Sequence, residues 1–346
     1  MKRSVLVLGS LFAVAGFLFS QERITLYGIK GPSGIGMIRL FESPPQVAGW
    51  QISLEALAQA DLMAAKFASG EAKLGILPPN VAAKLYAAGR PIQVLAVVGE
   101  GMLSLITADP AIRGIGDLRG KTVEVAGQGA TPDFVFRRIL SYYGLTPGKD
   151  VQLGYALAYP EIAQSLKAGK IQTALLPEPF ATMALSGSPH LRVVGNIQDE
   201  WNRATLAPDA TTGASEEGGA QKAPATGGSQ SGGASAGTPS YPMTVFVVDR
   251  TFAAANPTVV KAIAEAYRAS IQWVVQNPLE AGRLVQKHEL GLTAAVATAA
   301  IPRSAYVFIP AREARPALER LFAAFLEYAP QSIGGKLPGD DFYGTF

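Results

Sequence analysis

Residues 28–42 read GIKGPSGIGMIRLFE, and they predict a strand that turns sharply into a helix. The apolar run at 24–29 enters the segment as a strand, and the apolar run at 35–42 leaves it with helical spacing. Between them lie Lys30 and a glycine-rich loop, a composition that can present backbone N–H groups to a ligand at a helix N-terminus. The segment predicts an α/β unit and raises the question of whether its loop binds a ligand.

The same order of strand, turn and helix continues towards residue 194. Asn80 and Thr131 are the expected N-caps of two of the helices, which Gly89 and Gly144 are expected to end. The predicted strands cover 50–54, 73–77, 92–98, 102–108, 121–126, 151–155, 172–176 and 191–194, and the predicted helices cover 61–69, 81–88, 131–143, 161–168 and 178–185. This alternation indicates parallel sheets covered by helices.

A second loop of the same design lies at Gly127–Pro132, again between a strand and a helix. One such loop is explained equally well by the steric needs of a tight turn. Two loops, one in each half of the chain, predict a cleft that uses helix N-termini to bind a polar or acidic group. Open parallel sheets bind ligands at the carboxyl ends of their strands, which is where Asn80 and Glu178 also lie.

The α/β pattern is interrupted at 204–240, where glycine, alanine, serine, threonine and proline dominate. Such a composition buries too little apolar surface to offset the entropy of ordering, so we predict a disordered low-complexity insertion. The chain then returns to order with a predicted strand at 243–249. Predicted helices follow at 256–277, 278–287, 293–299 and 315–328.

The N-terminus predicts export. Lys2 and Arg3 precede an apolar stretch at 5–19, which is too short to span a bilayer and is typical of a secretory signal peptide, here 1–20. An uncleaved N-terminal anchor is the alternative. The chain has no cysteine, which excludes a lipoprotein anchor and disulfides. We therefore expect a periplasmic or otherwise extracytoplasmic protein.

Net charge and chain length restrict the class of protein further. The formal net charge of the full chain is +3, and removal of the two basic residues of the signal leaves +1. A nearly neutral chain argues against nucleic acid as a partner. A chain of 346 residues usually forms two domains or lobes.

No catalytic or metal-binding pattern stands out. His190 and His288 have no carboxylate at ligand spacing, and the absence of cysteine removes thiol chemistry. The loop at 31–36 matches neither a dinucleotide-binding fingerprint nor a P-loop. We expect no catalytic residue, no metal and no cofactor.

Several short motifs occur along the chain in a fixed order. They are GEAKLGI at 70–76, GRPI at 89–92, DLRGKTV at 117–123, LSYYGL at 140–145, and AGKIQTA at 168–174 with EPF at 178–180. Together they resemble the substrate-binding proteins of ABC importers, in the nitrate/sulfonate/taurine branch (NitT/TauT, SsuA/ThiY-like), and their order and spacing are more specific than any one motif. Two departures are Lys73 and Gln172, which stand where the branch carries aspartate.

The resemblance implies the type II periplasmic-binding fold, with two α/β lobes joined by two crossing strands. Lobe 1 would comprise 22–105 plus 246–346, and lobe 2 would comprise 106–245, with crossings near 102–108 and 243–249. Contacts to both lobes would favour hinge closure around a ligand. A monomer would then deliver that ligand to a membrane permease with its ATPase, without catalysis.

The expected ligand is a small polar or anionic organic molecule, and sulfonate, nitrate, pyrimidine and flavin all stay open. Tyr155, Tyr159 and Phe180 are candidates for stacking on a flat ring, or alternatively core and rim residues. The expected ligand-binding residues are Lys30, Gly31, Ser33, Gly34, Asn80, Gly101, Met102, Gln128, Gly129, Ala130, Thr131 and Glu178.

Two other functions stay open. Enzymes of chorismate processing and pyrimidine synthesis use the same two-lobed architecture, and Glu178 or Lys30 would then act as acid or base. The predicted export signal argues against such an enzyme, because those substrates are cytoplasmic. An exported sensor that presents its ligand to a receptor is the third alternative.

Overall fold

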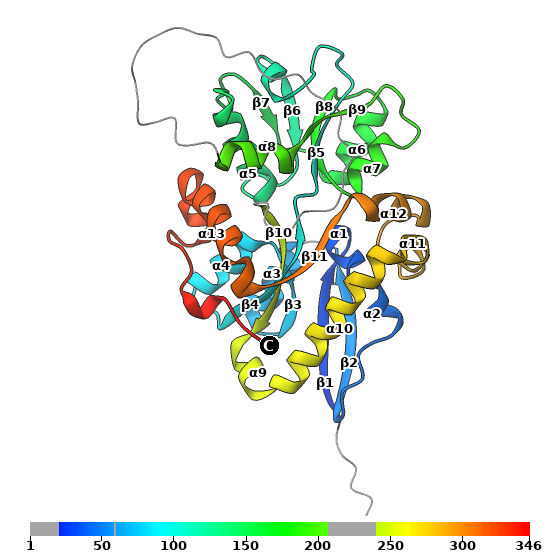
Figure 1. The fold of residues 1–346 in the computed structure, drawn as a ribbon, viewed down its shortest axis with the longest axis vertical. Helices are drawn as coiled ribbons and strands as arrows, with labels where there is room; N and C mark the ends of the chain where they lie inside the picture. The colour runs from blue at the N-terminus through cyan, green and yellow to red at the C-terminus, as the bar shows by residue number, and fades with distance from the viewer. Residues whose placement is uncertain (1–20, 59, 207–239) are drawn as a thin grey trace, which may run out of the picture.

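The computed structural model describes residues 21–58, 60–206 and 240–346, which form two α/β lobes (Figure 1). The predicted signal peptide lies outside the described residues, as does the predicted insertion apart from 204–206 and 240. In the part of the chain that is described, no helix combines the length and the hydrophobicity that a bilayer crossing requires.

The first lobe is built on a six-stranded sheet in the order β11-β4-β10-β3-β1-β2. β1 pairs in parallel with β2 and β3, whereas β10 is antiparallel to β3 and β4. The strands are β1 (Glu22–Ile29), β2 (Trp50–Leu57), β3 (Leu74–Leu77), β4 (Ile92–Glu100), β10 (Pro242–Asp249) and β11 (Ala305–Pro310).

The second lobe is built on a five-stranded sheet in the order β7-β6-β8-β5-β9. β6 is parallel to β7 and β8, while β5 is antiparallel to β8 and β9. The parallel prediction is therefore confirmed for the βαβ units and is wrong for β5 and β10, which enter their sheets from the other lobe. The strands are β5 (Leu103–Thr107), β6 (Thr122–Val125), β7 (Gln152–Gly154), β8 (Thr173–Pro177) and β9 (Arg192–Asn196).

Helices cover both sheets (Figure 1). Those of the first lobe are α1 (Pro32–Ile35), α2 (Ile38–Glu42), α3 (Ala60–Ser69), α4 (Pro79–Ala87), α9 (Arg250–Ala255), α10 (Pro257–Gln276), α11 (Pro278–Lys287), α12 (Ala294–Ala300) and α13 (Ala311–Tyr328). Those of the second lobe are α5 (Thr131–Tyr142), α6 (Tyr159–Lys167), α7 (Phe180–Leu185) and α8 (Ile197–Leu206). Short 3-10 turns are η1 (Ile115–Leu118), η2 (Ile301–Arg303), η3 (Pro330–Ile333) and η4 (Asp340–Phe342).

The predicted helix at 35–42 is wrong as a single helix, because α1 ends at Ile35 and α2 begins at Ile38. The carbonyl oxygen of Gly36 accepts a hydrogen bond of 2.8 Å from the hydroxyl of Ser270 on α10. A Cβ on Gly36 would lie 3.3 Å from Ile271. The close approach of α10 thus takes the backbone out of the helical ladder at this point.

Both predicted N-caps are wrong by one or two residues. Pro78 is the N-cap of α4, so Asn80 lies inside the first turn of that helix. Ala130 is the N-cap of α5, and Thr131 is its first helical residue. Neither side chain therefore caps its own helix, and each can contact other parts of the molecule.

The chain crosses between the lobes at Gly101–Met102, between the last residue of β4 and the first of β5. On its return, Pro242 of β10 already pairs with Glu100 in the first sheet. The predicted boundaries after residues 105 and 245 fall inside β5 and β10, so we propose to place them at the two crossings. Buried Tyr241 joins the crossings, since its carbonyl oxygen accepts the Gly101 N–H at 3.1 Å.

The main hydrophobic core continues from one lobe into the other. Phe134 of α5 packs edge-on against Phe325 of α13, with ring centroids 4.5 Å apart, and both rings are buried. Figure 1 shows α5 directly above α13 on this side of the molecule. The lobes therefore share apolar contacts beside the crossing strands as well as through them.

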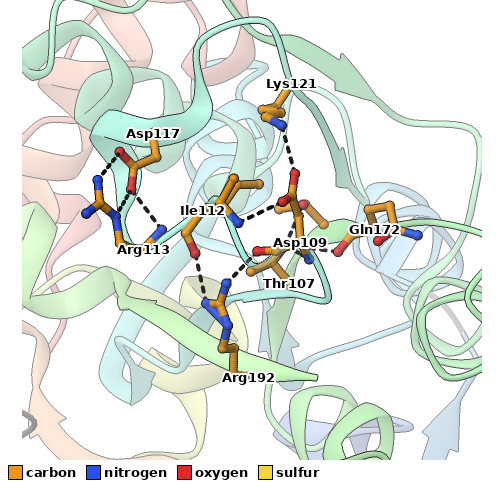
Figure 2. Close-up of polar contacts among 10 residues, drawn as sticks. Thr107, Asp109, Ile112, Arg113, Asp117, Lys121, Gln172 and Arg192 are labelled. Atoms are coloured by element: carbon orange, nitrogen blue, oxygen red, sulfur yellow. Dashed lines mark hydrogen bonds and ion pairs between the residues drawn. The ribbon is translucent and has the colours of Figure 1, made fainter. Parts of the chain in front are cut away.

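The outer end of the second sheet, which we define by Thr107, Asp109, Lys121, Gln172 and Arg192, is a hydrogen-bonded network (Figure 2). Arg192 donates to the carbonyl oxygen of Ile112 at 2.8 Å and to that of Asp109. The Asp109 carboxylate pairs with Lys121 at 2.8 Å. The Thr107 hydroxyl donates to the carbonyl oxygen of Gln172 at 3.1 Å. Charged and polar groups at this end thus have partners within the lobe.

Candidate functional site

The two predicted loops lie where the lobes meet. Asn80 of the first lobe reaches the second loop, and its side-chain N–H lies 3.4 Å from the carbonyl oxygen of Gly129. A Cβ on Gly31, in the first loop, would lie 3.9 Å from the ring of Phe180 in the second lobe. The Glu178 amide donates to the carbonyl oxygen of Met102 at 3.0 Å. The structure therefore brings both loops and the Glu178 segment to the junction between the lobes.

The first loop offers less to an anion than its sequence predicts. Helix α1 has four residues, too few for an appreciable macrodipole. Gly31 has a φ of 101°, which glycine adopts without strain. A Cβ on Gly34 would come within 2.6 Å of the carbonyl oxygen of Ile29. Lys30 is exposed and Ser33 half-buried, so the steric explanation accounts for the glycines of this loop.

The second loop is occupied by a carboxylate of the chain itself. Asp133, in the first turn of α5, is 2% exposed and accepts the Gly129 N–H at 2.9 Å. Its other oxygen accepts Arg137 at 2.7 Å and the Tyr155 hydroxyl at 2.6 Å. The expectation of free N–H groups at this helix N-terminus is wrong for Gly129. Tyr155 bonds to the network and is a structural residue.

The backbone of the second loop makes a further internal bond. The Ala130 amide donates to the carbonyl oxygen of Gly127 at 3.0 Å, which closes the turn. Gln128 is exposed to solvent, whereas Ala130 is half-buried. Among the predicted residues of this loop, Gly129 therefore contacts Asn80 of the other lobe, and Thr131 is buried in the interior.

Two predicted residues carry buried polar atoms that have no hydrogen-bond partner among the described residues. These are the amide oxygen of Asn80 and the hydroxyl of Thr131, in residues that are 8% and 2% exposed. An unsatisfied buried polar group costs about 1–3 kcal/mol. Asn80 and Thr131 lie at the starts of α4 and α5, on opposite lobes. Their arrangement fits groups that a bound molecule would satisfy.

Glu178 is a buried carboxyl at this junction. It is 4% exposed and follows β8, and one of its oxygens accepts the Thr182 N–H at 3.1 Å. Burial raises the pKa of Glu178, while hydrogen bonds from Thr182 and the charge of Arg303 in the first lobe offset part of that rise. Tyr306 of β11 lies within electrostatic range of the same carboxyl. Residues of both lobes thus surround Glu178.

Sequence reasoning missed Arg303 and Tyr306, because β11 was not predicted. Its sequence AYVFIP is an apolar run that favours a strand, so a signal was present. Tyr306 is 9% exposed, and burial raises the pKa of its hydroxyl. Arg303 is exposed and lines an open groove of about 560 Å³ beside the end of α7. What places both beside Glu178 is the antiparallel pairing of β11 with β4.

Glu100 is another buried carboxyl near the crossing, and sequence reasoning missed it. It ends β4 and is 5% exposed, and burial raises its pKa while Ser240 lowers it in part. The available signal was a single acidic residue at the end of an apolar strand. Next to it, a Cβ on Gly101 would lie 1.9 Å from the side-chain oxygen of Gln198, so a larger residue there would require that side chain to move. Met102 is buried.

Tyr159 and Phe180 form a stacked pair whose ring centroids lie 5.5 Å apart at an angle of 17°. Phe180 is the ring nearest to Gly31 of the first lobe. The pair therefore forms an aromatic wall at the junction. Elsewhere His288 bonds to Glu42 at 2.8 Å, and within the described ranges no three His, Asp or Glu side chains gather as a metal site.

Comparison with known proteins identifies the central segment. Residues 40–188 match the model of the NMT1-like family. This segment, which is less than half of the chain, is similar to that family. It contains the second loop and Glu178, and the first loop precedes it. No curated protein sequence matches the chain.

Solved structures with the same fold extend over nearly the whole chain. An ABC transporter protein from Parabacteroides distasonis has a TM-score of 0.72 and 24% identity, covering 94% of this chain and 99% of that one. The periplasmic aliphatic sulphonate binding protein SsuA from Escherichia coli has a TM-score of 0.65 and 16% identity, covering 91% and 96%. The ligand-binding component of an ABC-type import system from Staphylococcus aureus, with zinc bound, has a TM-score of 0.66 and 13% identity, covering 94% and 97%.

These matches confirm the fold predicted from the motifs, that of two-lobed periplasmic binding proteins. They also confirm the resemblance to the nitrate/sulfonate/taurine branch around the NMT1-like segment. At identities below 25%, the likeness to solved structures concerns the fold, and the chemistry of the junction has to be judged from this chain's own residues.

Proposed function

We propose that this chain is an exported solute-binding protein of an ABC importer, which captures a small polar molecule between its lobes. The observation that carries the proposal is the meeting of buried polar groups from both lobes, with Glu178 on one side and Asn80 on the other. A molecule that contacts both lobes stabilises the closed arrangement. The binding proteins among its structural neighbours support the same role.

The partners and the location belong to the same proposal. A membrane permease with its ATPase would receive the solute from a monomeric binding protein. The signal peptide predicted at 1–20 would export the chain to the periplasm or an equivalent compartment. The protein itself would catalyse no reaction, because its part would be capture and delivery.

A thermal-shift screen of the exported protein tests the proposal. Anions, sulfonates, pyrimidines, flavins, amines and amidines are added one at a time. Any compound that raises the melting temperature is then followed by small-angle X-ray scattering. We expect the radius of gyration to fall on binding, because the lobes close. A screen without any stabilising compound would contradict a binding role, and turnover of a compound would favour the enzyme.

A double variant tests the predicted site. Ser33→Ala combined with Thr131→Ala should weaken the binding of a compound found in the screen by at least about tenfold, because each hydroxyl contributes about 1 kcal/mol as a hydrogen-bonding group. Ser53→Ala combined with Thr251→Ala is the matched control, since both side chains are exposed. Equal affinity in the two double variants would place the site elsewhere.

A further inference from the structure

Resting on the proposed function, we propose that the junction selects a cation or a neutral molecule rich in N–H donors, such as an amidine or amine, and disfavours oxyanions. The proposal narrows the expectation of a polar or anionic ligand. It also separates this chain from its sulphonate-binding neighbour SsuA. Three features of the described junction carry it.

The first feature is the occupied N-terminus of α5. A helix N-terminus attracts an anion through its free N–H groups and its dipole. Here the Asp133 carboxylate already accepts the Gly129 N–H at 2.9 Å and adds a negative charge to the first turn. Pro132 in that turn has no N–H to give. The Gly129 N–H that an oxyanion would use is therefore already bonded to Asp133, whose own charge is paired with Arg137.

The second feature is that the described residues of the opposite lobe supply no buried cationic side chain at the junction. The first loop leads into a helix of only four residues. Its Lys30 is exposed, and Arg303 is exposed beside an open groove. Water and salt screen charges in such positions. Neither side chain can therefore act as the desolvated partner that a buried sulfonate or nitrate requires.

The third feature is the buried acceptor set. Glu178 is 4% exposed, accepts the Thr182 N–H, and forms no ion pair with any residue the structure describes. Arg303 acts on Glu178 through its charge but forms no ion pair with it, so a cationic N–H donor in direct contact would be the strongest partner of this buried carboxylate. The Asn80 amide oxygen adds another unsatisfied acceptor. A donor-rich ligand would satisfy both, and the buried hydroxyl of Thr131 can accept as well.

The test uses sets of probes with matched shape and different charge. Benzamidinium, benzamide and benzoate form one set, acetamidinium, acetamide and acetate form another, and nitrate and ethanesulfonate are added as oxyanions. Dissociation constants for the exported protein are measured by isothermal titration calorimetry at pH 7. We expect each amidinium to bind at least about tenfold more tightly than its carboxylate, as a charge-assisted hydrogen bond to Glu178 requires.

Glu178→Gln supplies the second arm. Glutamine keeps the shape and accepts the Thr182 N–H, so the fold is retained, but the charge is lost. The preference for amidinium over amide should fall by about tenfold. Glu265→Gln, an exposed change of the same charge on α10, should leave the preference intact. Circular dichroism confirms that both variants are folded.

The outcomes separate this proposal from the proposed function. Tighter binding of carboxylates, nitrate or ethanesulfonate, or an equal response across each set, would overturn the selectivity for cations and donors. An unchanged preference in Glu178→Gln would also overturn it. If an oxyanion binds and closes the lobes, the chain remains a solute-binding protein and only the present inference fails.

Discussion

The two ends of the second sheet differ in whether their charged side chains have partners within the protein. At the outer end, Arg192 bonds to two carbonyl oxygens and Asp109 pairs with Lys121 (Figure 2). At the cleft end of the same strands, Glu178 is buried with no ion pair among the described residues. β5 joins the two ends, from Leu103 beside Pro177 to Thr107 beside Thr173. The charged groups of the outer end are thus paired within the lobe, whereas Glu178 at the cleft end has no ion pair and, under the proposed function, can bond to a ligand.

The largest expected effect concerns Asp133, a carboxylate at the cleft end whose two oxygens are both hydrogen-bonded. Asp133→Ala should lower the free energy of unfolding by about 3 kcal/mol, because the partly buried Arg137 guanidinium and the Tyr155 hydroxyl lose their acceptor. Urea denaturation followed by circular dichroism measures the change. Asp61→Ala, an exposed aspartate on α3, is the control and should change it by less than about 0.5 kcal/mol. Equal midpoints would show that the Asp133 network is not stabilising.

The next effect concerns the outer end. Arg192→Ala should cost about 2 kcal/mol, since two carbonyl oxygens lose a charged donor. The affinity of any ligand found in the screen should stay unchanged, because Arg192 bonds at the end of the sheet away from Glu178. Urea denaturation and calorimetry measure the two quantities. A large loss of affinity would break the division between a stabilising end and a binding end.

A smaller effect of opposite sign is expected at the cleft end. Because burial raises the pKa of Glu178 above its ordinary value of 4.5, ionisation costs stability in the folded protein. The contribution of Glu178 is thus complete below about pH 4.5 and is lost as pH rises through the raised pKa. Glu178→Gln should therefore stabilise the unliganded protein at pH 7, because the neutral amide avoids the cost of a buried charge.

The pH dependence of the stability difference between Glu178→Gln and the wild type supplies the control. Near pH 4 the carboxyl of the wild type is protonated and resembles glutamine, so the difference between the two proteins should vanish. Melting temperatures measured from pH 4 to pH 8 give the profile. A variant that is less stable than the wild type at pH 7 would mean that the Glu178 charge is satisfied within the chain.

The smallest effect is expected at an exposed ion pair beside the outer end. Arg113 bonds to Asp117 at 3.3 Å, but its side chain is 81% exposed (Figure 2). Exposed ion pairs of this spacing contribute about 0.3–0.5 kcal/mol. Arg113→Ala should shift the urea midpoint barely above error. A loss above about 1 kcal/mol would show that the periphery of the network stabilises the lobe as much as Arg192 does.

Local pattern was sufficient for most of the elements. Apolar runs with glycine or proline at their ends predicted β1, β3 and β8, because such runs fold against whatever core is near. Local pattern was insufficient where a contact with an element distant in sequence changes the local structure. The bond between Ser270 and the Gly36 carbonyl oxygen divides the first helix. Helix α8 lies on α5 and was missed, because its amphipathic pattern borders the low-complexity stretch.

The sequence by itself determined the α/β alternation, the two lobes and the segments that reach their junction, since periodicity and turn residues act over a few positions. Only the tertiary structure decided what those segments offer. Asp133 accepts an N–H group at a helix N-terminus that was predicted to be free, and η2 and β11 bring Arg303 and Tyr306 beside Glu178. The physical reason is that the free energy of a charge depends on burial and on partners distant in sequence, which no local pattern records.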